Sequence, residues 1–325
     1  MDYGLMPDRL SSLINHRRLL EAVRVSVEKD LYRHMERPVP LAEISSRTGM
    51  ELQFSEYLLE TLHKCGYLEK STGADGIALY KNTPESGMYL NSRRPTFIGA
   101  DVFTDVEIGD LLDRFVSSGP GCMTIDKGHW TQERLKSIAS MSLLGSVQYA
   151  VSNIDLSGRK NMLDIGGGHG LYSIFFSKQY PDLKCTIIEL PQVAELAREF
   201  IRHYDTERSV DVISSDYNDA MPEGRYDVVL LSNIVASIEE LDNLLAISKK
   251  HLVEGGLLVL RNFVCDAVDD CGSSLTVLER YSRRGKKGYS KQQLIDAMRN
   301  NGISDVRVTG AFESTVIIQG IYNKE

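Results

Sequence analysis

A glycine-rich segment, Asp164-Ile-Gly-Gly-Gly-His-Gly170, follows a short apolar run and precedes a segment with helical spacing. Glycines at 166, 168 and 170 let the backbone turn sharply and admit a ligand where a Cβ atom would collide. A strand, a glycine turn and a helix in this order are typical of sites that bind nucleotide-containing cofactors. The segment therefore predicts a cofactor site at the end of a strand.

The details of this turn favour S-adenosylmethionine (SAM) over a dinucleotide. Gly166, Gly168 and Gly170 follow the spacing G-x-G-x-G, whereas dinucleotide-binding turns use G-x-G-x-x-G. Asp164, just before the turn, would repel a pyrophosphate but could favour the cationic methionine end of SAM, directly or through water. The third detail is a terminal antiparallel hairpin predicted from the final two strand-like segments, Asp305–Thr309 and Ser314–Tyr322.

Acidic residues also follow the next two predicted strands. Glu189 ends the second strand, where a carboxylate can accept hydrogen bonds from both ribose hydroxyls. Asp216 and Tyr217 follow the third strand, where an acid can accept from the adenine amino group and an aromatic ring can cover the base. The plainer interpretations are a solvated charge, a loop acid and a core tyrosine. Because ligands bind at the carboxyl ends of strands in such sheets, we favour the cofactor roles.

From Ser157 onward, short apolar runs alternate with segments of helical spacing, which predicts an α/β fold with a doubly wound parallel sheet. The predicted strands are Asn161–Ile165, Cys185–Leu190, Asp211–Ser214, Tyr226–Ser232, Gly256–Phe263, Asp305–Thr309 and Ser314–Tyr322, and the predicted helices are 169–179, 191–204, 238–251 and 289–301. No helix separates the last two strands, which are joined by Gly-Ala-Phe-Glu. They predict a terminal antiparallel hairpin, which is unusual for a dinucleotide-binding fold.

The chain changes character near residue 105. Helical spacing over Leu19–Arg33, Leu41–Met50 and Ser55–Lys64, followed by two strand-like runs around a Gly-containing turn, predicts a winged helix-turn-helix. We therefore expect two domains, 1–105 and 106–325, and we expect 106–156 to supply bridging helices.

A winged helix suggests DNA binding, but the charges of its third helix oppose it. Glu51–Glu60 carries three glutamates and no cation, and phosphates would repel it. We expect a protein–protein module without a nucleic-acid partner, with the Leu19–Arg33 helix available to a dimer partner. A winged-helix regulator whose second domain senses a ligand is a further alternative.

Composition limits the other possible partners. The 325 residues are 42% hydrophobic and 25% charged, as in ordinary soluble proteins, and the net charge of −8 disfavours nucleic acid and anionic membranes. No apolar run approaches the roughly 18 residues of a membrane span, and the N-terminus lacks a secretory pattern. The five cysteines are scattered without a C-x-x-C pair. These features predict a cytoplasmic protein without disulfides, a metal site or a membrane partner.

Together these motifs resemble the SAM-dependent small-molecule O-methyltransferase family, which includes plant caffeic acid and animal hydroxyindole O-methyltransferases. The segments that resemble its SAM motifs in order and spacing are Asp164–Gly170, Ile188–Pro191, Ser215–Tyr217 and Tyr226–Asn233, and those that resemble its N-terminal dimerisation domain are Leu41–Met50, Tyr57–Leu68 and Tyr80–Pro84. The resemblance spans nearly the whole chain. It implies a class I methyltransferase domain, a homodimer formed through the N-terminal domain, and Ser232 as a further cofactor residue.

The chain departs from this family at the usual general base. Typical members follow the fourth strand with a Leu-His-Asp-Trp-like sequence whose His is the base, and Ala236 falls where that His would be. Met141 and Tyr149 lie on the helix that lines the acceptor pocket in relatives, and Asn233 is one turn from Ala236. His129, beside the only tryptophan, is a weak candidate for a replacement base because we expect it in a loop.

Methyl transfer from SAM can proceed without a dedicated base. The methyl group is already activated on a sulfonium, so orientation can supply about 7–11 kcal/mol in favourable cases, whereas a base typically adds about 10²–10⁴-fold. The sequence therefore predicts a methyltransferase that acts on oxygen, nitrogen or carbon of a small aromatic or heteroaromatic acceptor, mainly by proximity and orientation. The alternative is a SAM-binding enzyme of the same fold with non-methylating chemistry.

Overall fold

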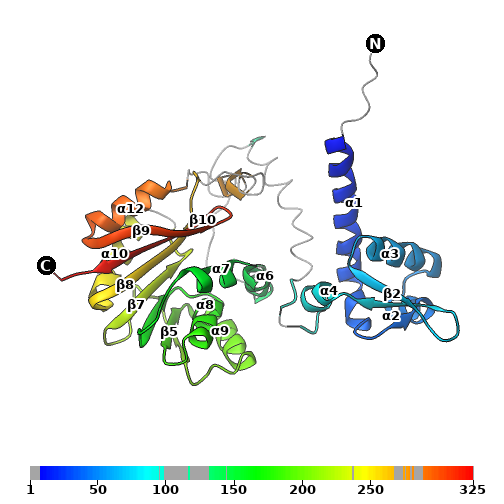
Figure 1. Cartoon of the computed structure of the whole chain (residues 1–325), viewed down its shortest axis with the longest axis horizontal. Helices are drawn as coiled ribbons and strands as arrows, with labels where there is room; N and C mark the ends of the chain where they lie inside the picture. The colour runs from blue at the N-terminus through cyan, green and yellow to red at the C-terminus, as the bar shows by residue number, and fades with distance from the viewer. Residues whose placement is uncertain are drawn as a thin grey trace, which may run out of the picture. The chain divides into compact units, whose positions relative to one another are not determined.

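The computed structural model describes residues 8–94, 96–98, 116–117, 132–143, 145–235, 238–266, 274, 276–278, 280–281 and 288–324. The chain divides into two compact units (Figure 1). The first contains Met1–Glu107 with Lys136–Met141, and the second contains Ile108–Leu135 with Ser142–Glu325. Lys136–Met141 therefore groups with the first unit, although we expected 106–156 in the second domain.

The first unit opens with α1 (Asp8–Glu28), followed by a short 3-10 helix, η1 (Leu31–His34). The prediction of a single helix over Leu19–Arg33 was therefore wrong at both ends. Asp30 adopts a left-handed φ of 53°, which interrupts the helical hydrogen-bond pattern between the two helices. The apolar spacing continues across this break because Leu31 and Tyr32 of η1 are also buried.

Two further helices, α2 (Leu41–Thr48) and α3 (Leu52–Lys64), lie close to their predicted positions. α3 begins earlier than the predicted Ser55 because Glu51 caps it. The Glu51 carboxylate accepts hydrogen bonds from the backbone N–H groups of Gln53 at 2.9 Å and Phe54 at 2.7 Å. The inner face of α3 is buried in the core of this unit through Leu58, Leu59 and Leu62.

An antiparallel sheet in the order β1-β3-β2 completes this unit, followed by one short helix. The bounds are β1 (Val39–Pro40), β2 (Leu68–Thr72), β3 (Ala78–Asn82) and α4 (Pro84–Tyr89). Helices followed by an antiparallel hairpin make the element order that the sequence predicts for a winged helix-turn-helix.

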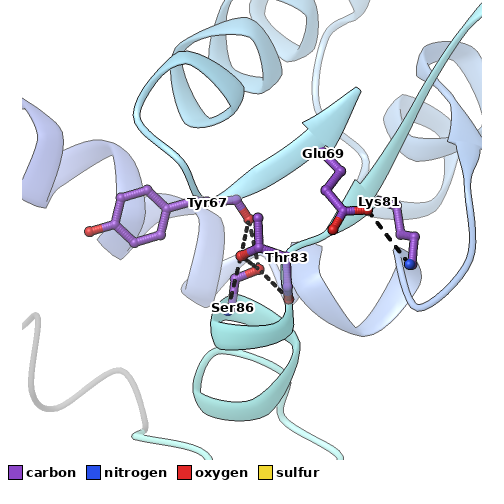
Figure 2. A network of polar contacts seen from close by, with 5 residues as sticks. All are labelled: Tyr67, Glu69, Lys81, Thr83 and Ser86. Atoms are coloured by element: carbon purple, nitrogen blue, oxygen red, sulfur yellow. Dashed lines mark hydrogen bonds and ion pairs between the residues drawn. The ribbon is translucent and has the colours of Figure 1, made fainter. Parts of the chain in front are cut away.

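Figure 2 shows how the hairpin is joined to α4. The hydroxyls of Thr83 and Ser86 both donate to the carbonyl oxygen of Tyr67, at 3.3 Å and 2.7 Å. Thr83 Oγ1 also accepts from the backbone N–H of Ser86 at 3.3 Å and so caps α4. An ion pair of 3.6 Å between Lys81 and Glu69 links the two strands. These contacts fix where the chain leaves the hairpin.

The second unit is built on a seven-stranded sheet in the order β6-β5-β4-β7-β8-β10-β9. Its strands are β4 (Asn161–Ile165), β5 (Lys184–Glu189), β6 (Val210–Ser214), β7 (Tyr226–Ser232), β8 (Leu252–Phe263), β9 (Ile303–Phe312) and β10 (Thr315–Tyr322). The five strands from β6 to β8 pair in parallel, and β10 runs antiparallel to both β8 and β9. This order confirms the predicted α/β fold with a terminal antiparallel hairpin.

The hairpin turn itself differs from the prediction. We expected Gly310–Glu313 to form the connection, but β9 continues to Phe312 and only Glu313, with a left-handed φ of 50°, and Ser314 remain outside the two strands. Ala311 and Phe312 pair with Val316 and Thr315 of β10. Pairing with the neighbouring strand therefore extends β9 beyond the glycine that the sequence suggested as a turn residue.

Helices cover both faces of the sheet (Figure 1). They are α7 (Ser146–Asn153), α8 (Leu171–Gln179), α9 (Pro191–His203), α10 (Ile238–His251) and α12 (Lys291–Asn300). A further helix, α6 (Gln132–Leu143), contributes Lys136–Met141 to the first unit. The core on the face of α10 and α12 includes Leu163, Leu231, Leu244, Leu260 and Leu294. Burying each such leucine stabilises the fold by about 1.5–3 kcal/mol. Among the described helices, none has the length and apolar character of a membrane span.

Candidate active site

The predicted cofactor turn joins β4 to α8 at the carboxyl end of β4. Gly166 and Gly168 both have left-handed φ, 66° and 57°, and Gly170 directly precedes α8. A Cβ atom on Gly166 would lie 2.3 Å from Cδ1 of Ile234, whereas one on Gly168 would meet no described atom within 4 Å. Gly166 is therefore required by close packing, while Gly168 leaves one side of the turn open to a ligand.

Asp164 is enclosed between this turn and α8. Its side chain is 1% exposed, and Oδ2 accepts a hydrogen bond of 2.7 Å from Ser173 Oγ. Burial raises the pKa of Asp164 to about 7. Oδ1 is buried and has no hydrogen-bond partner among the described residues. The carboxyl thus anchors the start of α8 and keeps one acceptor available beside the turn.

Glu189, at the end of β5, is tied directly to the glycine turn. Its Oε2 accepts from the backbone N–H of Gly168 at 3.0 Å, and its Oε1 accepts from the backbone N–H of Leu190 at 2.7 Å. Burial raises the pKa of Glu189, although these two backbone hydrogen bonds oppose the shift. Its carbonyl oxygen accepts from the N–H of Ser215, which begins the segment after β6. The ends of β4, β5 and β6 are therefore linked through one residue.

The next two predicted residues follow Ser215. Asp216 Oδ1 accepts from the backbone and side-chain N–H groups of Asn218, both at 3.0 Å. The hydroxyl of Tyr217 donates to Glu240 Oε1 at 3.1 Å, and its ring packs against the buried core. Asp216 therefore lies beside Glu189 at the sheet edge, whereas the described contacts of Tyr217 are those of a partly buried packing residue.

His169, inside the turn, is held as a neutral ring. Nδ1 accepts a hydrogen bond of 3.1 Å from the backbone N–H of Leu171, so the proton must lie on Nε2, which is 3.1 Å from Ser142 Oγ. Burial, and then the positive charge of Arg261, lowers the pKa of His169 to about 4. These contacts hold the His169 ring in place within the turn. Its role depends on contacts distant in sequence, so no motif pointed to it.

A buried arginine from β8 lies beside the turn, and no sequence pattern pointed to it either. Arg261 is 5% exposed, and its guanidinium carbon lies 5.1 Å from the centroid of the Tyr172 ring. Its Nη1 lies 3.4 Å from Oγ of Ser232, the cofactor residue implied by the family resemblance. The hydroxyls of Tyr172 and Ser146 lie 2.9 Å apart. Burial lowers the pKa of Arg261 from its usual value.

Two of the residues expected to line the acceptor side have described side chains. The Tyr149 hydroxyl accepts from the N–H of Ala311 at 3.1 Å, and its ring centroid lies 5.3 Å from that of Phe312, so its contacts hold α7 against β9. Asn233 is exposed, has a left-handed φ of 55°, and donates its N–H to the Arg261 carbonyl oxygen at 2.8 Å. The other two expected pocket residues, Ala236 and the side chain of Met141, lie outside the described residues, as does His129, the weak candidate for a replacement base.

The described part of the chain contains no group of three or more His, Cys, Asp or Glu side chains that could hold a metal ion. The polar groups that it does bring together are the Asp164 and Glu189 carboxyls, the Asp216 side chain, and the Ser232–Arg261 pair. Acidic acceptors at the ends of β4 to β6 suit hydroxyl and amino donors of a nucleoside. The cation on β8 lies on the other side of β4 in the strand order.

Comparison with known proteins places the chain among methyltransferases. A family model described as the O-methyltransferase domain matches residues 129–281. A 3-hydroxy-5-methyl-1-naphthoate 3-O-methyltransferase of Streptomyces sahachiroi is 27% identical over 290 residues, which cover 82% of this chain and 80% of that enzyme. A bacteriochlorophyllide d C-20 methyltransferase of Chlorobaculum tepidum is 26% identical over 258 residues, which cover 75% of each chain.

Solved structures agree on the fold. Human N-acetylserotonin methyltransferase, determined in complex with SAM, superposes with a TM-score of 0.77 at 19% identity, and the match covers 100% of both chains. At this identity the likeness shows the class I methyltransferase fold. The family model over residues 129–281 and the curated relatives show that the chain is a SAM-dependent methyltransferase with an O-methyltransferase domain.

Proposed function

We propose that this enzyme transfers the methyl group of SAM to an oxygen, nitrogen or carbon atom of a small aromatic or heteroaromatic acceptor. The observation that carries the proposal is the hydrogen bond between Glu189 and Gly168, which sets an acidic acceptor beside an open glycine turn. Two curated relatives support the acceptor class, since one is named for a naphthoate and the other for a bacteriochlorophyllide.

Each cofactor residue has a role that fits the chemistry of SAM. Glu189 would accept hydrogen bonds from the ribose hydroxyls, and Asp216 would accept from the adenine amino group. Gly168 leaves room for the chain of the cofactor, and the unpartnered Oδ1 of Asp164 can receive its ammonium group directly or through water. Ser232 lies on the far side of β4, where it would face the methionine end. Bound SAM supplies an activated methyl group on a sulfonium.

Orientation would carry most of the rate enhancement. His169 cannot accept a proton readily, because Nδ1 is already hydrogen-bonded and burial keeps the ring neutral. Ala236 corresponds to the usual base of the family. Without a base, an acceptor that is already ionised or electron-rich is favoured over a phenol that retains its proton. Holding such an acceptor in line with the reacting bond can supply about 7–11 kcal/mol.

We further propose that residues 1–105 form the dimerisation domain and that the enzyme is a homodimer. Large apolar side chains of this unit are exposed, among them Leu13 at 65% and Leu20 at 46% on α1 and Tyr57 at 67% on α3. A second copy would bury such surface and stabilise the pair. Light scattering on the full chain should give twice the mass of one chain, and a monomer at all concentrations would overturn this assignment.

Methyl transfer is tested by incubating the full-length protein with methyl-labelled SAM and a panel of hydroxylated, aminated and unsubstituted aromatic compounds. Label on an acceptor, absent from heat-inactivated controls, supports the proposal, and the labelled atom distinguishes oxygen, nitrogen and carbon. Binding of SAM without label transfer to any acceptor would favour non-methylating chemistry on the same fold, which the alanine at 236 makes the second candidate. Failure to bind SAM would overturn both.

A further inference from the structure

Arg261 is a buried cation with only neutral contacts among the residues that the structure describes. It is 5% exposed, and its nearest described groups are the Ser232 hydroxyl at 3.4 Å and the Tyr172 ring at 5.1 Å. Glu313 attracts the guanidinium, but it is exposed and does not form an ion pair with it. Burying a charge without an opposite charge is costly, so such a site is suited to an anionic partner.

The position of Arg261 in the sheet places it on the side of the cofactor turn opposite the expected nucleoside site, where the methionine end of SAM is expected to bind. Glu189 ends β5 and Asp216 follows β6, and both strands lie on one side of β4. Arg261 belongs to β8, which lies beyond β7 on the other side. Arg261 is paired in register with Ser232 at the end of β7. The guanidinium carbon lies 5.1 Å from the ring centroid of Tyr172, the second residue of α8, so it is close to the turn that precedes this helix. The cation therefore faces away from the end expected to bind the nucleoside.

The environment of Arg261 holds the guanidinium in one place. The Tyr172 ring lies beneath it, and the Tyr172 hydroxyl is fixed by its contact with Ser146 Oγ at 2.9 Å. A guanidinium presents five N–H donors in a plane, and the described residues supply one long hydrogen bond, from Nη1. The planar donors match the two oxygens of a carboxylate better than a neutral group does.

We propose that Arg261 is an anion-binding residue of the active site and that it binds a ligand carboxylate. The inference rests on the proposed function, in which two molecules can present a carboxylate near this position. One is the methionine end of SAM, and the other is an aromatic acceptor that carries an acid group. In either case the carboxylate orients its molecule by two parallel hydrogen bonds, and in the second case Arg261 selects aromatic acids as the substrate class.

The first arm of the test concerns the cofactor. Calorimetry compares S-adenosylhomocysteine with 5′-methylthioadenosine, which keeps the adenosine but lacks the amino acid, on the full-length wild type and on Arg261→Gln. If Arg261 binds the methionine carboxylate, R261Q weakens S-adenosylhomocysteine binding roughly ten- to a hundred-fold, the usual effect of one charged hydrogen-bonding partner. Binding of 5′-methylthioadenosine stays unchanged.

The second arm concerns the acceptor. With S-adenosylhomocysteine at saturation, the same proteins are titrated with 1-naphthoate and with 1-naphthamide, which has the same ring and a neutral group. If Arg261 binds an acceptor acid, the wild type prefers naphthoate and R261Q loses that preference by roughly ten-fold or more. The amide binds both proteins equally. This comparison separates a ligand contact from a purely structural arginine, which would affect the acid and the amide alike.

Two further variants serve as controls. Arg159→Gln removes an arginine of the same unit that donates to the Gly255 carbonyl oxygen at 3.0 Å, at the other end of the sheet strands, and should leave the binding of all four probes unchanged. Arg261→Lys keeps the charge but not the planar donors, so it should retain part of the selectivity for carboxylates. If R261Q does not fold, as judged by circular dichroism, the comparison is made with R261K, which should still lose several-fold in carboxylate binding alone.

The inference is overturned if the variant that folds binds S-adenosylhomocysteine and naphthoate as tightly as the wild type does. It is also overturned if the substitution weakens binding of each carboxylate probe no more than binding of its neutral counterpart, which is 5′-methylthioadenosine for S-adenosylhomocysteine and 1-naphthamide for 1-naphthoate. Either result would leave methyl transfer intact, because label transfer to a neutral acceptor does not require Arg261. Loss of label transfer with retained carboxylate selectivity would instead contradict the proposed function.

Discussion

The carboxylate of Glu189 accepts a hydrogen bond of 3.0 Å from the backbone N–H of Gly168, so the end of β5 is tied to the glycine turn that follows β4. One of its oxygens thereby sets the shape of the turn. The same carboxylate is the expected acceptor of the ribose hydroxyls, so a single side chain both shapes the site and binds the cofactor. Because burial already raises its pKa, the ionised form depends on these hydrogen bonds.

Replacement of Glu189 by glutamine should therefore weaken cofactor binding without unfolding the protein. The variant keeps the size of the side chain but loses the negative charge, and hydrogen bonds to a charged group contribute about 1.5–3 kcal/mol. Calorimetry with S-adenosylhomocysteine should show affinity lower by roughly ten- to a hundred-fold. Glu195→Gln on α9, whose carboxylate forms an ion pair with Arg198 in an exposed position, is the matched control and should bind normally. Equal affinity in both variants would argue against a ribose contact.

The two central glycines of the turn should respond differently to alanine. Both glycines have a left-handed φ, so alanine is strained at either position; in Gly166→Ala the new Cβ would also lie 2.3 Å from Ile234, and this overpacking should cost about 1–3 kcal/mol more and lower the melting temperature further. Gly168→Ala meets no described neighbour and should cost only the strain of its left-handed φ, on the order of 1–3 kcal/mol. Its methyl group would instead occupy space expected for the cofactor. Thermal unfolding without S-adenosylhomocysteine should show a small decrease in the melting temperature of G168A. The further increase in melting temperature that the ligand produces should be much smaller in G168A than in the wild type.

The buried Asp164 predicts a pH dependence of stability. Its pKa is raised from 3.8 to about 7 by burial, so between these values the folded state binds more protons than the unfolded state. The free energy of unfolding that Asp164 contributes is therefore fully present below about pH 4 and is lost as the pH rises towards about 7. In Asp164→Asn this dependence disappears, while the acceptor for Ser173 is kept.

Urea unfolding of the wild type and D164N at pH 5 and pH 8 checks this prediction. The wild type should lose stability relative to D164N at the higher pH, by a few kcal/mol in order of magnitude, since one pKa unit corresponds to about 1.4 kcal/mol. His169 titrates in both proteins and cancels in the comparison. A difference that is constant with pH would show that Asp164 keeps its usual ionisation.

A conservative substitution of Tyr149 tests whether this residue packs α7 against β9 or contacts the acceptor. Tyr149→Phe removes the hydroxyl that accepts from the Ala311 N–H, and the loss of one such hydrogen bond should cost about 0.5–1.5 kcal/mol of stability. Because the ring packs against Phe312, we expect the KM for an acceptor identified in the label-transfer panel to remain unchanged. A KM that rises several-fold with little change in stability would instead restore Tyr149 to the acceptor site.

The elements that position the cofactor were largely predictable from the sequence. Asn161–Ile165 and Tyr226–Ser232 were predicted with the bounds of β4 and β7, because a parallel strand covered on both faces is a continuous apolar run between turn residues. Glu189 and Asp216 could then be placed at neighbouring strand ends by order alone. The start of α1 was missed because the helical spacing was followed only from Leu19, although Leu13 and Ile14 of its first turns are also apolar and are exposed within this unit.

Features that depend on partners distant in sequence could not be predicted in this way. The charge state of His169 follows in part from its contact with Ser142, which is 27 residues away, and from its burial, and neither of these is a local signal. Arg261 is a single cation in the apolar strand β8, where sequence patterns suggest an exposed edge. Only the three-dimensional arrangement shows that this arginine is buried against Tyr172 beside the turn.

The most direct measurement is a crystal structure of the full-length protein with S-adenosylhomocysteine. We predict that both ribose hydroxyls lie within hydrogen-bonding distance of the Glu189 carboxylate, that the ligand passes Gly168 on its open side, and that the adenine amino group reaches Asp216. A nucleoside bound away from Glu189, with the Gly168–Glu189 hydrogen bond unchanged and Asp216 without a ligand contact, would contradict the cofactor site proposed for this methyltransferase.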